Sequence, residues 1–326
     1  MQEYVDNKLS LIEAPRGFMT NTKELDETWL NKVVSSNGQI GWIGSNGRPD
    51  AAAGHSIIAG EYKNKSPQLI TLCNQVVKQC KGTVVKHRIW PIAPKDIRLV
   101  AFVDSSFDPK GERHQQGWLI GYTNPFLNQN MKAPFSLALW RSRKLPRKAG
   151  SPQLVETFAG SYGAADMNWV KCVFFSSQYS DFNILTQRPE HWGPVVRGPT
   201  VLRTERPEVE DTLCTMISDS KGLFDALNNE LPQDDKKSAT EVPIIEEQMH
   251  RMFGRCRWVP HNYNPADALT KVRGAHLAPL MELLRTGMYW LKTEAAQLAS
   301  RAQEKVLTGK TARHKHGSKR TMEENS

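Results

Sequence analysis

Apolar residues near the start of the chain recur at helical spacing. Leu25, Trp29 and Val33 lie one turn apart within residues 20–36, which predicts an amphipathic helix there. The stretch that follows, "GWIGSNGRPD" at residues 41–50, is rich in glycine and polar residues. We interpret it as loop and turn, because glycine and proline are the strongest local breakers of regular structure.

A second helix is predicted over residues 66–82. Ser66 suits the N-cap, Pro67 suits the first helical position, and Gly82 follows the last apolar residue. One face of this helix is apolar, and it carries Leu69, Ile70, Cys73, Val76, Val77 and Cys80. Residues 1–95 are therefore expected to form a mainly helical segment.

From residue 96 onwards, short apolar runs replace the helical spacing. "IRLVAFVD" predicts a strand that ends at Asp104, and "QGWLIGY" and "FSLALW" predict two further strands. The connections between them are short enough for antiparallel neighbours. A helix is expected over residues 151–172, with a face of small residues that would let it approach the sheet closely.

Residues 173–211 lack periodicity and contain many prolines and glycines, so we predict an inserted loop. Next, "TLCTMISD" predicts a strand ending at Asp219, and "SKGLFDALNNEL" a helix with Ser220 as its cap. "SATEVPIIEEQMHRMFG" predicts another helix and "RCRWVP" another strand, and "NPADALTK" opens the last helix. The predicted order is β, β, β, α, β, α, α, β, α.

Composition narrows the class of protein. The chain has 326 residues, 39% of them hydrophobic, which is enough for one sizeable domain and an accessory segment. Five scattered cysteines without a C-x-x-C pair suggest neither a disulfide framework nor a zinc site. The net charge of +9 favours a polyanionic partner.

The sequence also indicates where the protein works. No apolar run approaches the roughly 20 residues of a membrane helix, and the first residues do not resemble a secretory signal. We therefore expect an intracellular protein, cytoplasmic or nuclear, that is not secreted and has no membrane partner. Residues 293–326 have too little apolar surface to fold alone, so we expect a basic, disordered tail.

Four acids fall at suggestive places: Asp104, Glu156, Asp219 and Asp267. Each has an ordinary explanation, since aspartate is common at strand ends and Asp267 suits the first turn of a helix capped by Asn264. Together they suggest a metal site, because neighbouring strand ends open on one crevice and clustered carboxylates need a cation. Oxygen ligands favour Mg²⁺ or Mn²⁺, and two such ions can promote phosphodiester hydrolysis.

Basic residues just before the Glu156 helix are candidates for phosphate contacts. The alternative is an ordinary solvated loop. The residues are Arg141, Arg143, Lys144, Arg147 and Lys148.

The sequence around the four acids resembles that of the RNase H domain of copia-type retrotransposon Pol polyproteins. The matching stretches are "VAFVDSSF", "SPQLVETFAGSYGAADMNWV", "ISDSKGLFDAL" and "NPADALTK". The resemblance implies a ribonuclease H-like fold, with a mixed five-stranded sheet (β-β-β-α-β-α-β-α core) flanked by helices. It also implies that Asp104, Glu156, Asp219 and Asp267 bind two Mg²⁺ or Mn²⁺ ions and that the substrate is an RNA/DNA hybrid.

The resemblance extends upstream. "IGWIGSNGRPDAAAGHSIIAG" resembles the segment after the polymerase core of copia-type reverse transcriptases, but the Tyr-x-Asp-Asp motif is missing from the sequence. We expect residues 1–95 to have no polymerase activity and residues 96–292 to form the RNase H-like domain. The rest of Pol, reverse transcriptase and integrase, is a possible partner.

His261 precedes Asp267 by six residues. Cellular ribonucleases H often place a histidine before the last aspartate, so His261 is a candidate for proton transfer; the alternative is a polar loop residue. Two functions follow: a metal-dependent endonuclease that cuts the RNA strand of hybrids, or a non-catalytic nucleic-acid-binding remnant of a decayed retroelement. The order Asp, Glu, Asp, Asp argues against a DDE-type integrase.

Overall fold

The computed structural model describes residues 1–108, 114–186, 188–189, 212–228, 236–272 and 275–299. The chain divides into two compact units, Met1–Leu291 and Lys292–Ser326. The sheet, the helices that cover it and the N-terminal helices all belong to the first unit. Within the described ranges, no helix combines the length and the apolar character needed to cross a membrane.

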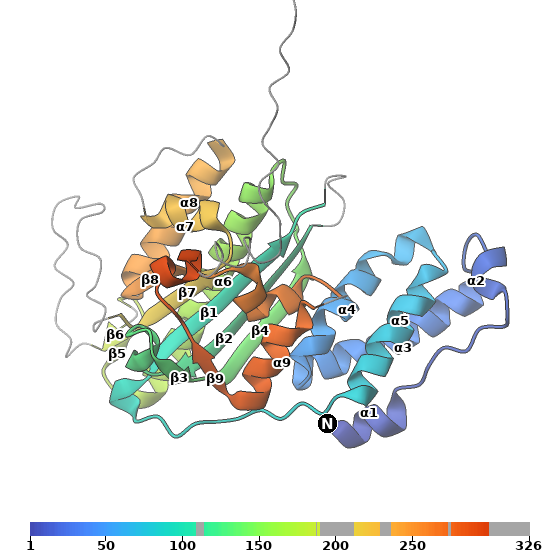
Figure 1. Cartoon of the computed structure of the whole chain (residues 1–326), viewed down its shortest axis with the longest axis horizontal. Coiled ribbons are helices and arrows are strands. Elements are labelled where there is room, and N and C mark those ends of the chain that lie inside the picture. Colours follow the sequence, from blue (N-terminus) through green and yellow to red (C-terminus); the bar gives the residue numbers. More distant parts are fainter. Residues whose placement is uncertain (109–113, 187, 190–211, 229–235, 273–274, 300–326) are drawn as a thin grey trace, which may run out of the picture. The chain divides into compact units, whose positions relative to one another are not determined.

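The centre of the first unit is a mixed five-stranded sheet (Figure 1). Its strands are β1 (Arg98–Ser106), β2 (Gln115–Thr123), β4 (Ser136–Lys144), β7 (Cys214–Ser218) and β8 (Gly254–Trp258). They lie in the order β4-β2-β1-β7-β8. The pairs β1–β2 and β2–β4 are antiparallel, whereas β1–β7 and β7–β8 are parallel. This is the topology of the ribonuclease H-like fold, so the predicted fold class is confirmed.

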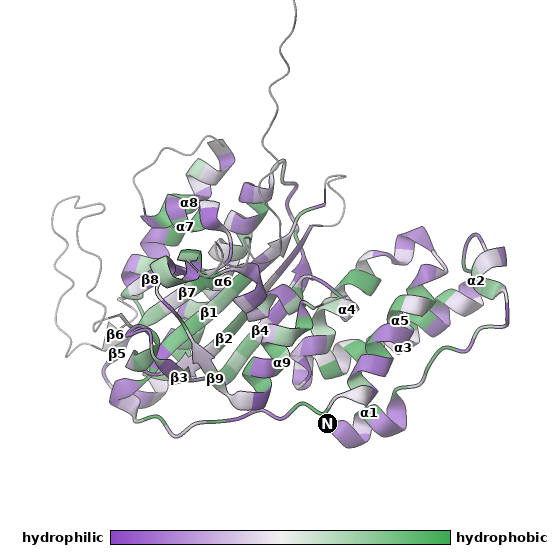
Figure 2. Ribbon diagram, viewed as in Figure 1, coloured by the Kyte–Doolittle hydropathy of each residue, from purple (hydrophilic) through white to green (hydrophobic). Residues whose placement is uncertain are grey.

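Alternate residues of β1 supply the two cores of the sheet. Val103 packs in one apolar cluster with residues of α6 (Pro152–Gln178), α7 (Lys221–Asn228) and α8 (Lys236–Arg251). Phe102 packs in the other, with residues of the 3₁₀ helix η6 (Pro265–Leu269) and of α9 (Leu277–Thr286). Both faces of the sheet are therefore covered, and Figure 2 accordingly colours β1 and β2 mainly hydrophobic.

The N-terminal helices have an apolar core of their own. They are α1 (Gln2–Lys8), α2 (Phe18–Asn21), α3 (Glu27–Asn46), α4 (Pro49–Gly60) and α5 (Gln68–Gly82). The six apolar residues predicted for the face of α5 are all buried in this core. Helix α5 begins two residues later than its predicted cap, with Pro67 at the N-cap.

The loop predicted over residues 41–50 is wrong. Helix α3 continues to Asn46, and α4 begins at Pro49. The glycines that suggested a loop let the two helices approach each other: a Cβ at Gly41 would lie 2.4 Å from the His55 ring, and one at Gly44 would lie 3.3 Å from the Ala52 backbone. Glycine serves close packing here and does not break the helix.

The N-terminal helices are joined to the sheet by specific hydrogen bonds. Trp140 on β4 donates its indole N–H to the Gly44 carbonyl at 2.6 Å. The Gln115 amide on β2 donates to the Ser56 hydroxyl on α4 and to the Ser142 hydroxyl on β4, each at 2.8 Å. Residues of α4 therefore lie directly against one edge of the sheet.

Two predicted segments differ from the structure. Residues 173–178, predicted to open the insertion, continue helix α6. Residues 187 and 190–211 of the predicted insertion lie outside the described residues. The stretch "NPADALTK" forms the short 3₁₀ helix η6 rather than the start of the last helix, α9. At its end the Thr270 hydroxyl donates to Asp104, and Gly117 leaves room for Leu269, since a Cβ there would lie 2.5 Å from it.

The remaining elements are short, and β3 pairs antiparallel with β9 and β5 with β6. They are η1 (Tyr62–Asn64), η2 (Pro94–Asp96), η3 (Pro125–Leu127), η5 (His261–Tyr263), β3 (Lys132–Pro134), β5 (Phe182–Asn183), β6 (Arg188–Pro189) and β9 (Met288–Trp290).

Candidate metal centre

Two neighbouring parallel strands bring the first pair of acids together. Val103 on β1 is paired in register with Ser218 on β7, so the next residues, Asp104 and Asp219, lie side by side. The predicted strand end at Asp104 is wrong, because β1 continues to Ser106 and Asp104 is still paired with Gly117 on β2. Asp104 thus lies near the carboxyl end of β1 and Asp219 directly after β7, where crevices form in sheets of this kind. The position of these two acids follows from the register of the two strands.

Helix α6 brings the third acid, Glu156. The helix begins where the Ser151 hydroxyl accepts the Leu154 N–H at 3.2 Å, which fixes Glu156 in its first two turns. Further along, Gly163 lets the helix lie close to β1, since a Cβ there would be 2.5 Å from Val103 Cγ1. Cap and glycine together set the distance of Glu156 from the strand ends.

Asp104, Glu156 and Asp219 converge. Each offers one carboxylate oxygen, and these three oxygens all lie within 4.8 Å of one another. Asp104 is 1% exposed, and the Glu156 Oε2 atom is buried without a hydrogen-bond partner among the described residues. Three oxygen donors with one left unsatisfied suit a hard divalent cation such as Mg²⁺ or Mn²⁺.

Burial and mutual repulsion raise the pKa values of the three acids. Burial raises the pKa of Asp104 well above its ordinary value, and the neighbouring Asp219 charge raises it further. Burial and the charges of Asp104 and Asp219 likewise raise the pKa of Glu156. The pKa of Asp219 is raised by burial, although a hydrogen bond from Asn264 opposes the shift. A cation between the acids would relieve this repulsion.

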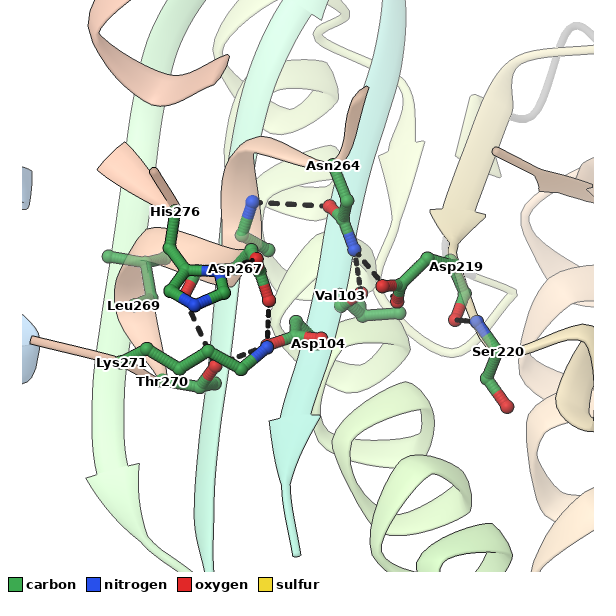
Figure 3. Close-up of polar contacts among 12 residues, drawn as sticks. Val103, Asp104, Asp219, Ser220, Asn264, Asp267, Leu269, Thr270, Lys271 and His276 are labelled. Carbon is green, nitrogen blue, oxygen red and sulfur yellow. Dashed lines mark hydrogen bonds and ion pairs between the residues drawn. The ribbon is translucent and has the colours of Figure 1, made fainter. Parts of the chain in front are cut away.

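Asp267 lies on η6 with different partners (Figure 3). It is 2% exposed, forms an ion pair with the Lys271 ammonium, and its second oxygen lies 2.5 Å from His276 Nδ1. The Lys271 ammonium is also 3.6 Å from Asp104 Oδ2. The converging group therefore contains three of the four predicted acids, and Asp267 reaches it through Lys271.

Asn264 ties the two halves of the centre together. Its side-chain oxygen accepts the Ala266 N–H at 3.1 Å, which is the predicted cap. Its amide donates to the Val103 carbonyl at 2.9 Å and to Asp219 Oδ1 at 3.2 Å (Figure 3). The cap that holds Asp267 in place thus also contacts β1 and the Asp219 carboxylate.

The histidine that contacts Asp267 is His276, whereas the sequence had singled out His261. His261 lies exposed on η5, and its side chain has no hydrogen bond or ion pair within the described ranges. His276, just before α9, contacts Asp267 instead. Its only signal in the sequence is a histidine near a helix start, too common a feature to single it out. The role of His261 stays a prediction.

The five predicted phosphate-binding residues have different surroundings. Arg141 pairs with Asp166 at 2.8 Å and Arg147 with Glu241 at 2.5 Å. Arg143 lies over two aromatic rings, those of Trp118 and Tyr162. The other two, Lys144 and Lys148, are exposed, and neither has an ion pair in the part of the chain that the structure describes.

No protein-family model matches the sequence, and a search of curated proteins finds no match. Among solved structures, the chain is similar to RNase H1 from the halophilic archaeon Halobacterium salinarum NRC-1. The identity is 13% and the TM-score 0.33, over 53% of this chain and 93% of that one. It is also similar to the N-terminal RNase H domain of Rv2228c from Mycobacterium tuberculosis, at 11% identity and a TM-score of 0.34, over 57% and 98% of the two chains.

Proposed function

We propose that this protein is a metal-dependent endonuclease that hydrolyses the RNA strand of RNA/DNA hybrids. The observation that carries the proposal is the convergence of three acids: Asp104 near the end of β1, Glu156 in the first turns of α6, and Asp219 directly after β7. Carboxylates this close to one another and largely removed from water repel, and the repulsion destabilises the fold unless a cation neutralises them. A bound divalent cation would supply that charge.

The residues fit a Mg²⁺ or Mn²⁺ centre. Asp104, Glu156 and Asp219 would hold the first ion, and Asp104 with Asp267 would contribute to a second. When bound, such ions activate a water and stabilise the leaving oxygen of a phosphodiester. The Thr270 hydroxyl holds Asp104 by a hydrogen bond, and the Glu156 oxygen without a partner is available to an ion. His276 and Asn264 would position Asp267 and Asp219 respectively.

Charge and sequence resemblance support a nucleic-acid substrate. The net charge of +9 favours a polyanion, and exposed Lys144 and Lys148 follow β4 toward the Glu156 helix. Hybrid selectivity would come from 2′-OH contacts on the RNA strand and phosphate contacts on the DNA strand. The resemblance to copia-type Pol suggests a retrotransposon origin, with reverse transcriptase and integrase as possible partners.

The test is cleavage by the purified full chain in Mg²⁺, with labelled RNA/DNA hybrid, single-stranded RNA and duplex RNA as substrates. We expect cleavage of the hybrid alone. Asp104→Asn and Asp219→Asn should each lower the rate on the order of 10²-fold or more, since a catalytic metal contributes several kcal/mol. Asp225→Asn, which removes a half-buried carboxylate paired with Lys221 on α7, is the matched control.

A non-catalytic nucleic-acid-binding remnant is the second candidate, because a retroelement fragment can lose its activity. The presence of all four acids argues against decay. Binding of the hybrid without cleavage in either Mg²⁺ or Mn²⁺ would favour the remnant. Cleavage at the wild-type rate by Asp104→Asn would remove these acids from the mechanism.

A further inference from the structure

Lys271 places a positive charge inside the carboxylate centre. Its ammonium forms an ion pair with Asp267 and lies 3.6 Å from Asp104 Oδ2 (Figure 3). Asp104 and Asp267 have side chains only 2% exposed, whereas the Lys271 side chain is 32% exposed. Lys271 thus enters from the solvent side and ends between two buried acids.

Asp104 is shared between two groups of charges. On one side it converges with Glu156 and Asp219, neither of which forms an ion pair within the described ranges. On the other side it faces Lys271 and, through it, Asp267. While the ammonium is in this position, it offsets the charge of the second side and repels any further cation that approaches Asp104 from there.

We propose that Lys271 is the internal counter-ion of the Asp104–Asp267 side of the centre and competes with a divalent cation for it. The Asp104–Glu156–Asp219 side then binds one ion tightly, and a second ion binds only when the Lys271 side chain swings out. The inference deepens the proposed function, since it rests on this being a metal centre.

The surroundings let Lys271 leave without disturbing the acids. Thr270 donates its hydroxyl to Asp104, and His276 contacts Asp267, so both carboxylates keep a partner when the ammonium withdraws. A lysine has a flexible four-carbon stem and a strongly hydrated charge, which suits movement into solvent. Lys271 is therefore a positioning residue that sets the number of ions bound.

The test is calorimetric titration of the metal-free full chain with Mn²⁺. We expect one tight ion in wild type and in Lys271→Arg, which keeps the charge. Lys271→Met should bind two ions tightly. The affinity of the Lys271→Met variant for the second ion should rise at least about tenfold. A neighbouring positive charge lowers the affinity of a carboxylate for a proton by about tenfold to a thousandfold, and it opposes a metal cation in the same way. Lys78→Met, on an exposed position of α5, removes the same charge elsewhere as the control.

Thermal melting gives a readout that is independent of cleavage. Lys271→Met should melt lower than wild type without metal, because it leaves Asp104 and Asp267 without their cation, and should gain more from saturating Mn²⁺. Equal stoichiometry and affinity in wild type and Lys271→Met would overturn the proposal, as would two equally tight ions in wild type.

The two proposals fail differently. If wild type binds no Mn²⁺, both the metal centre and the role of Lys271 fall. If wild type binds one ion and Lys271→Met binds two, but neither cuts the hybrid, the role of Lys271 stands and the proposed ribonuclease activity falls.

Discussion

At the scale of single residues, Asn264 shows how a cap acquires a second role. An exposed N-cap asparagine contributes about 1 kcal/mol. Asn264 is fully buried, and its amide also bonds the Val103 carbonyl and the Asp219 carboxylate. Removing it leaves buried groups without partners, each of which costs about 1–3 kcal/mol.

We therefore expect Asn264→Ala to lower the free energy of unfolding by about 2–3 kcal/mol, measured by urea denaturation. Asn124→Ala is the matched control, since Asn124 caps η3 with one bond, to the Phe126 N–H, and is only half-buried. That variant should lose about 1 kcal/mol. Equal losses in the two variants would mean that the bonds of the Asn264 amide contribute nothing.

The environment of Glu156 leads us to expect that its ionisation lowers the stability of the fold as the pH rises. Burial and two neighbouring acids raise its pKa in the folded chain. Below about pH 4 both the folded and unfolded chains keep the proton, and no difference arises. As the pH rises above this value, the unfolded chain ionises freely and the folded chain resists, so ionisation of Glu156 destabilises the fold.

Without metal, Glu156→Gln should therefore be more stable than wild type at neutral pH, and the difference should shrink as the pH falls toward 4. Excess Mg²⁺ should reverse the order at neutral pH, because the ion stabilises only the carboxylate form. Melting temperatures across this pH range, in chelator and in Mg²⁺, test both statements. A wild type that is more stable than the variant in chelator at every pH would contradict them.

At the scale of elements, we expect alanine substitution at two helical glycines to change the free energy of unfolding in opposite directions. Gly163 on α6 faces Val103 on the central strand, where an added Cβ would lie 2.5 Å from Cγ1. Gly38 on α3 has nothing within 4 Å of such a Cβ. Gly163→Ala should lower the free energy of unfolding by about 1–3 kcal/mol. Gly38→Ala should raise it by about 0.5–1 kcal/mol, because alanine favours a helix. Chemical denaturation of both variants gives the comparison, and two changes of the same sign would contradict it.

The elements that the sequence predicted well are those with strong local signals. β1 is a continuous apolar run buried on both faces, and α6 begins where the predicted helix does, with Ser151 as its N-cap. Prediction failed where the conformation of a glycine or of a motif is set by segments that are distant in the sequence. Gly41 and Gly44 look like loop residues until α4 packs against them, and η6 is short because Thr270 is held by β1.

Part of the candidate site was likewise predictable from the sequence. Asp104 and Asp219 could be placed side by side because each comes at the end of an apolar run in the sequence, and β1 and β7 are neighbours. Lys271 and His276 could not be placed, because their contacts with Asp267 depend on how η6 and the start of α9 fold back. Positions along one strand follow from periodicity, but contacts between segments require the tertiary structure.

At the scale of the whole molecule, the N-terminal helices and the sheet belong to one compact unit, Met1–Leu291. Trp140 donates to Gly44, and Ala52 packs against the core beneath η6 and α9. A chain that begins at residue 96 would expose these surfaces of the sheet to water. The helical segment is thus a structural part of the fold that carries the acids.

We expect the chain that starts at residue 96 to melt at a lower temperature than the full chain, followed by circular dichroism. Trp140→Phe removes the bond to Gly44 and part of the ring that stacks on His87, and should cost at least about 1 kcal/mol. Identical melting of the shortened and full chains would show that the helices do not support the sheet.

A chain of hydrogen bonds runs from α4 to the last-aspartate motif. Ser56 accepts from Gln115, Gln115 also donates to Ser142, and Ser142 donates to the Leu269 carbonyl at 2.6 Å. Leu269 directly precedes Thr270 and Lys271, which contact Asp104. A random-mutagenesis screen for lost cleavage should therefore recover substitutions in α4, a helix that carries none of the acids. Such hits would be misread as evidence for a second active site.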